Sequence, residues 1–246
     1  MDTVEVLIVI PAYNESNRIN KFEFLDYLKK HPNTNFLFVD DGSTDDTNIV
    51  LTELSQNNPS QINVLKLPKN LGKGNAVREG YLWAKKTYHF NYFGFIDSDL
   101  TIPLEVISNL YDTLKESNYN LSIASRFKDA SKLNTKASAF RKILSLFNKK
   151  ITDWMFNGVV SDTQCGCKLF KKNILPIAFT KSFISSWLFD IEIFLRLKKK
   201  NQFLVYEYQL TKLNANKDSR FRKRDLFLVF IKLNSIIFNY YIKKPK

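Results

Sequence analysis

The chain has 246 residues, of which 44% are hydrophobic and 25% charged, so it can bury a core and is not a disordered polymer. Its 37 Lys and Arg against 24 Asp and Glu give a formal net charge of +13, which favours nucleic acid, anionic lipid or phosphorylated substrates as partners. Two cysteines, Cys165 and Cys167, and two histidines form neither a disulfide framework nor a zinc motif, which indicates a reducing compartment.

Short β-branched runs alternate with amphipathic helical segments in the first half of the chain. The apolar runs predict strands at 4–10, 36–39, 62–67, 92–96 and 121–124. The 3.6-residue spacing predicts helices at 14–30, from a cap at Ser43 or Thr44 through Leu54, at 74–86, and from Pro103 through Leu114. This alternation predicts an α/β fold with a Rossmann-like, mostly parallel sheet flanked by helices.

Three of the predicted strands end in polar loops: Pro11–Glu15, Asp40–Asp45 and Asp97–Thr101. Because ligands of such sheets lie beyond the carboxyl ends of the strands, these loops are expected to converge on one site. Within the third loop, Asp97 and Asp99 suit a hard divalent cation that would bridge a nucleotide diphosphate. Taken alone, two acids at a strand end more often form a helix cap or a solvated loop than a metal site.

Two glycines and Lys73 precede the third predicted helix, in the stretch 70–75. Such a backbone can approach phosphate at a helix N-terminus. The spacing is not that of a P-loop, so we reject a P-loop at this position.

The second half of the chain carries two basic amphipathic segments, 137–156 and 226–241. Both suit an anionic membrane surface, and both equally fit core-facing helices with a solvated basic face. Polar residues interrupt the second segment, which is shorter than the ~20 apolar residues of a spanning helix, so we predict no transmembrane segment. The N-terminus lacks the pattern of a signal peptide.

In combination and in this order, the motifs resemble the inverting glycosyltransferase family 2, of GT-A fold. The matching stretches are Ile10–Glu15, Val39–Asp45, Asn70–Gly74 and Asp97–Asp99. The later stretches Ser125–Phe127, Phe140–Ser145, Asp162–Phe170 and Trp187–Glu192 are similar to the dolichyl-phosphate and polyprenyl-phosphate sugar transferases, the β-glucosyltransferases above all and also the related mannosyltransferases.

The resemblance implies roles for the matching residues. Nucleotide-sugar binding would involve Pro11, Tyr13, Glu15, Asp40, Asp41, Lys73, Asp97, Ser98, Asp99 and Arg126. The catalytic residues would be Asp99, Asp162 and Arg126, and Mg²⁺ or Mn²⁺ would bind Asp97 and Asp99. The acceptor phosphate would be held by Arg141, Ser145, Ser219 and Arg220.

Simple chemistry separates two kinds of acceptor. A lipid phosphate is already anionic and needs positioning by arginine, whereas a hydroxyl needs a general base. Asp162 is the candidate base; its alternative role is to orient the loop at Gln164. Glu192 either shapes the acceptor side or stabilises its own helix.

We therefore predict an inverting hexosyltransferase that moves glucose from UDP-glucose to a polyprenyl or dolichyl phosphate. A UDP-sugar is favoured over a GDP-sugar, and nucleic acid is not expected as a partner because acidic loops repel it. The alternatives are a family 2 enzyme that glycosylates a saccharide hydroxyl and, remotely, a non-enzymatic nucleic-acid-binding domain.

The expected location is the cytoplasmic side of a membrane, as a peripheral protein, with a membrane partner subunit or a homo-oligomer as further candidate partners. We predict a catalytic domain at 1–215, which contains an amphipathic acceptor segment at 137–160, and a basic amphipathic segment at 216–246.

Overall fold

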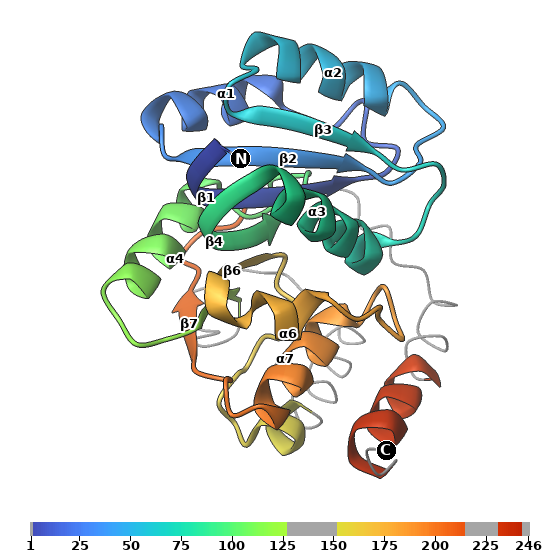
Figure 1. The fold of residues 1–246 in the computed structure, drawn as a ribbon, viewed down its shortest axis with the longest axis vertical. Coiled ribbons are helices and arrows are strands. Elements are labelled where there is room, and N and C mark those ends of the chain that lie inside the picture. The colour runs from blue at the N-terminus through green and yellow to red at the C-terminus, as the bar shows by residue number, and fades with distance from the viewer. Residues whose placement is uncertain (1, 127–151, 215–230, 243–246) are drawn as a thin grey trace.

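The computed structural model describes residues 2–126, 152–214 and 231–242, and these form a mixed sheet with helices on both faces (Figure 1). In the described part of the chain the sheet has seven strands in the order β3-β2-β1-β4-β6-β5-β7. The strands are β1 (Asp2–Ala12), β2 (Thr34–Asp40), β3 (Ile62–Lys66), β4 (Tyr88–Ile96), β5 (Leu121–Ser125), β6 (Cys167–Lys171) and β7 (Val205–Gln209). Of the described strands, only β6 runs antiparallel to its neighbours, β4 and β5.

The connecting segments are mostly helical. The helices are α1 (Lys21–Lys30), α2 (Thr47–Asn57), α3 (Lys73–Thr87), α4 (Glu105–Lys115), η2 (Lys172–Ile174), α6 (Leu175–Phe179), α7 (Phe189–Lys199) and η3 (Phe238–Ile242). Residues 152–156 and 231–237 are also helical.

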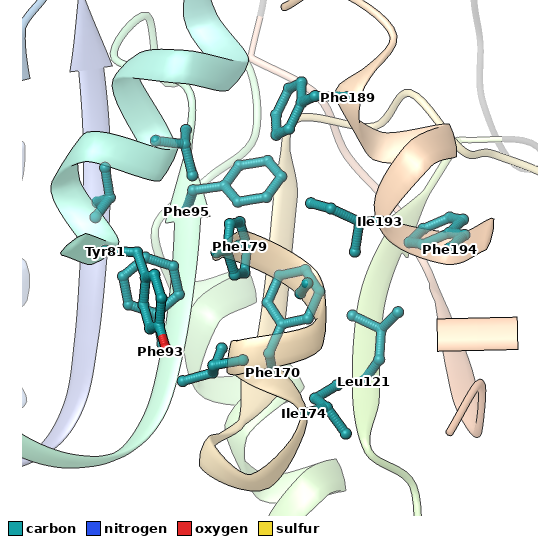
Figure 2. Close-up of a cluster of buried hydrophobic side chains, with 14 of the residues drawn as sticks. Tyr81, Phe93, Phe95, Leu121, Phe170, Ile174, Phe179, Phe189, Ile193 and Phe194 are labelled. Carbon is teal, nitrogen blue, oxygen red and sulfur yellow. The ribbon is translucent and has the colours of Figure 1, made fainter. Parts of the chain in front are cut away.

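The two faces of the sheet bury separate apolar clusters because side chains alternate along each strand. In β1, Val6 and Ile8 pack on the face covered by α1, α2 and α4, whereas Leu7 and Val9 pack on the face covered by α3, α6 and α7. Figure 2 shows the aromatic centre of the second cluster, where Phe residues of β4 and β6 meet those of α6 and α7.

The predicted α/β class and mostly parallel sheet are confirmed, and the five predicted strands correspond to β1 through β5. The helix predicted at 14–30 begins only at Lys21, because Asn14 has a φ of 52° and residues 14–20 form a bend, a turn at 16–18 and irregular backbone. The predicted cap at Ser43 or Thr44 is wrong: α2 begins after Asp46. The backbone N–H of Ser43 instead bonds Asp40, which turns this loop back toward β2.

Candidate active site

The three polar loops meet beyond the carboxyl ends of β1, β2 and β4, as the predicted topology requires. Ser43 Oγ accepts the backbone N–H of Asn14 at 3.0 Å, and Asn14 Oδ1 accepts the backbone N–H of Thr44 at 2.9 Å. Arg18, in the turns that follow β1, reaches Asp99 in the loop that follows β4 at 3.1 Å. These contacts join loops that are distant in sequence into one surface.

The loop after β2 also fixes the loop that precedes α3. Asp41 accepts the backbone N–H groups of Leu71 and Gly72, each at 2.8 Å. Gly42 has a φ of 69°, and a Cβ there would lie 2.4 Å from the Lys69 carbonyl carbon, so only glycine fits this close approach. Burial raises the pKa of Asp41, although these two N–H donors act in the opposite direction.

Asp40 and Asp41 therefore differ in what they contact. Both carboxylate oxygens of Asp41 bond the backbone of the neighbouring loop. Asp40 is fully buried, and its Oδ1 accepts the N–H of Ser43 at 2.8 Å, whereas its Oδ2 has no hydrogen-bond partner among the described residues. A buried carboxylate oxygen without a donor is costly, so Oδ2 of Asp40 keeps a capacity to accept a hydrogen bond that both oxygens of Asp41 have already used.

Both acids of the Asp97-Ser98-Asp99 motif are ion-paired and reachable from solvent. Lys73, the first residue of α3, contacts Asp97 at 2.5 Å, and the Asp97 side chain is 39% exposed. Asp99 is 26% exposed and pairs with Arg18. Burial alone would lower the pKa of Lys73, but the Asp97 carboxylate raises it above its ordinary value.

The backbone after this motif is strained and tied down. Leu100 has a φ of 51°, which a side-chain-bearing residue rarely adopts. Asn214 bonds the Leu100 carbonyl at 2.7 Å through its side chain and the Thr101 carbonyl at 2.9 Å through its backbone. Thr101 in turn donates its N–H to Asp99 at 3.0 Å. This loop is thus held in one conformation that aims the two acids.

Arg126 and Asp162 form a clamp beside the same edge of the sheet. Asp162 Oδ2 accepts Nε of Arg126 at 2.8 Å and its backbone N–H at 3.0 Å, while Oδ1 accepts Nη2 at 3.0 Å. Asp162 is buried, whereas the Arg126 side chain is 37% exposed. Burial alone would lower the pKa of Arg126, but the adjacent Asp162 carboxylate raises it.

Asp162 Oδ1 also accepts a hydrogen bond from the backbone N–H of Gln164 at 3.3 Å, so the predicted contact between Asp162 and the Gln164 loop is present.

The sequence reasoning missed several charged residues near the site. Lys168, on β6, is completely buried and pairs with Asp190 of α7 at 2.7 Å, between the rings of Phe95 and Phe194. Burial raises the pKa of Asp190, while Lys168 and Lys73 act to lower it. Arg18 and Glu207 were missed as well. The only sequence signal was that Lys168 and Asp190 lie inside the stretches that resemble the sugar transferases.

The remaining predicted site residues divide into described and undescribed positions. Pro11 and Tyr13 lie on the loop side of β1, and Glu15 is 8% exposed beside Arg18. Ser98 is 5% exposed between the two acids. The predicted acceptor-phosphate residues lie outside the described residues: Arg141, Ser145, Ser219 and Arg220.

Cys165 and Cys167 are buried and unbridged, and both pack in the apolar cluster on one face of the sheet. Burial raises the pKa of Cys165 to about 12 and that of Cys167 well above its ordinary value, so neither is a reactive thiolate. Within the described ranges no three His, Cys, Asp or Glu side chains come close enough together to hold a metal by themselves. Among these same residues no helix has the length and apolarity to cross a membrane.

Glu192 is buried on α7 and accepts the Ser185 N–H at 2.9 Å, with Arg196 at 3.6 Å. These contacts with Ser185 and Arg196 favour the second of its two predicted roles, which is to stabilise its own helix. Its part in acceptor binding stays a prediction.

The sheet order, the convergent acidic loops and the Asp97-Ser98-Asp99 motif define an α/β protein of the GT-A type. The chain belongs to glycosyltransferase family 2, because the model of the family described as "Glycosyl transferase family 2" matches residues 7–176.

Two curated relatives are dolichyl-phosphate beta-glucosyltransferases. The protein of Dictyostelium discoideum is 31% identical over 216 residues, which cover 82% of this chain and 64% of the relative. That of Saccharomyces cerevisiae is 27% identical over 215 residues, covering 79% and 63%. The chain thus spans less than two thirds of the length of either relative.

The fold also matches a solved structure, that of glucosyl-3-phosphoglycerate synthase from Mycobacterium tuberculosis in complex with Mn²⁺, UDP-glucose and phosphoglyceric acid. The TM-score is 0.69 at 16% identity, over 98% of this chain and 87% of the other. This likeness supports the GT-A fold.

Proposed function

We propose that the protein transfers glucose from UDP-glucose to a polyprenyl or dolichyl phosphate at a membrane surface, with inversion at the anomeric carbon. The names of the two curated relatives support glucose and dolichyl phosphate. One observation carries the choice of acceptor: Asp162 gives both of its carboxylate oxygens to Arg126. A carboxylate held in this way serves poorly as a base for a hydroxyl, whereas an exposed guanidinium suits a phosphate.

The donor would bind along the joined loops. Asp40 Oδ2 would accept an N–H of the base, and Asp41 would keep the loop before α3 in place. Lys73 lies at the N-terminus of α3, where backbone N–H groups and the helix dipole favour phosphate.

The donor set at Asp97 and Asp99 fits a hard divalent cation, because both side chains offer carboxylate oxygens and both are reachable from solvent. Mg²⁺ or Mn²⁺ held there would neutralise charge on the diphosphate leaving group. Asp97 and Asp99 would offer carboxylate oxygens to such an ion, and the diphosphate and water would supply its other ligands. The solved structure with Mn²⁺ and UDP-glucose supports this use of a metal.

The chemical step is an in-line displacement. A phosphate oxygen of the lipid forms a bond to the anomeric carbon as the bond from that carbon to the diphosphate oxygen breaks, and UDP leaves. The acceptor is already ionised, so no proton has to be removed. Arg126 would orient the attacking phosphate oxygen in line with the bond that breaks, and would offset the charge of the phosphate.

Exposed aromatic residues support a peripheral position at a membrane surface. Trp154 is 60% exposed, Phe238 53% and Tyr241 45%, and the Trp154 and Tyr241 rings lie 5.2 Å apart. Aromatic side chains favour the boundary between lipid and water. The basic residues of the chain would add attraction to anionic lipid.

The first experiment is transfer of radiolabel from UDP-glucose, with GDP-mannose as the competing donor, into organic-extractable lipid. It needs the purified chain, polyprenyl phosphate in detergent, and Mg²⁺ or Mn²⁺ with an EDTA control. Metal-dependent label in the lipid from UDP-glucose is expected. Label that appears only in a soluble saccharide would refute the proposal and make Asp162 the candidate base for a hydroxyl acceptor.

A further inference from the structure

Glu207 is a buried carboxylate that holds the segment carrying Asp162. Its Oε1 accepts the backbone N–H of Ser161 at 3.0 Å, the hydroxyl of Ser161 at 2.8 Å and the backbone N–H of Asp162 at 2.9 Å. Its Oε2 lies 3.1 Å from the same Ser161 nitrogen. Four contacts thus join one side chain of β7 to two consecutive residues, which are 45 and 46 positions away in sequence.

The alternation of side chains along β7 places Glu207 at an inward-facing position, where strand residues are usually apolar. It lies at the centre of β7 and pairs with Ile123 of β5. Because it is two residues from Val205, its side chain faces the same side of the sheet as Val205, which belongs to an apolar cluster. Only 8% of Glu207 is exposed. Taking a carboxylate out of water is costly unless hydrogen-bond donors surround it. The donors here are the backbone N–H groups of Ser161 and Asp162 and the Ser161 hydroxyl, so Glu207 holds these two residues in place.

The contacts continue from Asp162 to Arg126. Arg126 directly follows the end of β5, and β5 pairs with β7, so both ends of the chain of contacts rest on adjacent strands. Asp162 is buried and its carboxylate fixes both the backbone and the guanidinium of Arg126. Any shift of Asp162 would therefore move the guanidinium.

We infer that Glu207 is a positioning residue, which orients the Arg126 guanidinium toward a phosphate through Ser161 and Asp162. The inference rests on the proposed function, because it makes the acceptor phosphate the group that Arg126 meets. Glu207 itself touches neither substrate. Its effect on the reaction passes entirely through Arg126.

The decisive test is a double-mutant cycle with Glu207→Gln and Arg126→Ala. Glutamine keeps the shape of the side chain, but its amide offers one acceptor oxygen in place of two and adds N–H donors that face N–H groups. Glu207→Gln alone is expected to lower kcat/KM for polyprenyl phosphate about 10- to 100-fold, with the affinity for UDP-glucose nearly unchanged. In the Arg126→Ala background it should add less than about twofold, because the group it positions is gone.

Glu5→Gln is the matched control. Glu5 is a strand glutamate that accepts hydrogen bonds from Asn91 and Tyr111, and it lies on β1 well before the loops of the site. It should leave kcat/KM for both substrates unchanged. Effects of Glu207→Gln and Arg126→Ala that multiply, or a Glu207→Gln variant with unchanged kinetics, would overturn the inference.

A second measurement does not depend on transfer activity. The Nε–H resonance of Arg126, assigned by its loss in Arg126→Lys, should exchange slowly with water in the unaltered protein because Asp162 accepts it. Glu207→Gln should accelerate that exchange, and Glu207→Asp, which keeps the charge but shortens the reach, should do so less. If the unaltered protein transfers no glucose to lipid but this exchange still depends on Glu207, the proposed function fails and the positioning survives. Exchange that is insensitive to both variants would refute the positioning.

Discussion

Gly166 leaves room for the carboxylate of Asp97, and Gly166→Ala should displace it. A Cβ at Gly166 would lie 2.1 Å from Asp97 Oδ2 and 2.6 Å from its Cγ. An ordinary contact needs about 3.5 Å, so the carboxylate must retreat by more than about 1 Å. Because the obstructing atoms end a side chain, the fold can accommodate the change while Asp97 loses its position. Displacement of a reacting or ligand-binding group by about 1 Å costs on the order of 100-fold in rate.

The assay is kcat/KM for UDP-glucose at saturating metal, together with the affinity of Mn²⁺ for the protein in the presence of UDP. Both should fall in Gly166→Ala, the rate by about 3 kcal/mol of transition-state stabilisation. Gly80→Ala is the control, because its Cβ would meet Val9 and Val39 in the core and so cost stability away from the site. Full activity and unchanged Mn²⁺ affinity in Gly166→Ala would refute the claim that Asp97 must occupy this position.

Three further predictions follow from the described contacts. Asp99→Asn should abolish transfer while the urea midpoint of the variant stays that of the unaltered protein, and EDTA should abolish transfer by the unaltered protein. Full activity of Asp99→Asn would show that Asp99 does not hold a metal needed for transfer. Lys168→Met should lower the free energy of unfolding by about 3 kcal/mol or more because Asp190 is left buried without its cation, and Lys168→Met with Asp190→Leu should recover most of the loss in urea titrations. Equal stability of the single and double variants would contradict this. Replacing Trp154 and Tyr241 together by Ser should weaken sedimentation with anionic vesicles several-fold without changing UDP-glucose binding; unchanged sedimentation would place the membrane contact elsewhere.

The strands and acidic loops were predictable because their signals are local. The run that forms β1 is apolar and β-branched up to Pro11, and the run before Asp97 is apolar as well. A parallel sheet then brings the ends of such strands together without further information. The α2 cap failed for a related reason: Ser43 suits a helix cap locally, but its hydroxyl bonds the loop after β1.

The long-range ion pairs could not be predicted, because they join residues without a shared local pattern. Arg18 and Asp99 are 81 positions apart. β7 was missed because its pattern is inverted: in Val205–Gln209 the glutamate faces inward and the flanking tyrosines are more exposed. Alternation would place the tyrosines inside. The inward orientation of Glu207 therefore could not be predicted from the sequence, because it depends on the contacts of its carboxylate with Ser161 and Asp162.

Helix α7 connects the donor side of the site to the exposed aromatic surface. Near its first turn Asp190 lies close enough to interact electrostatically with Lys73. Toward its end Arg196 donates to the carbonyls of 178, 181 and 182 and to the hydroxyl of Tyr240. Tyr241 next to it donates to the Met155 carbonyl at 3.1 Å. One buried helix therefore contacts both the region of Lys73 and Asp97, where the proposed leaving group would lie, and Tyr240, beside the exposed Tyr241, so a change in α7 should affect both regions together.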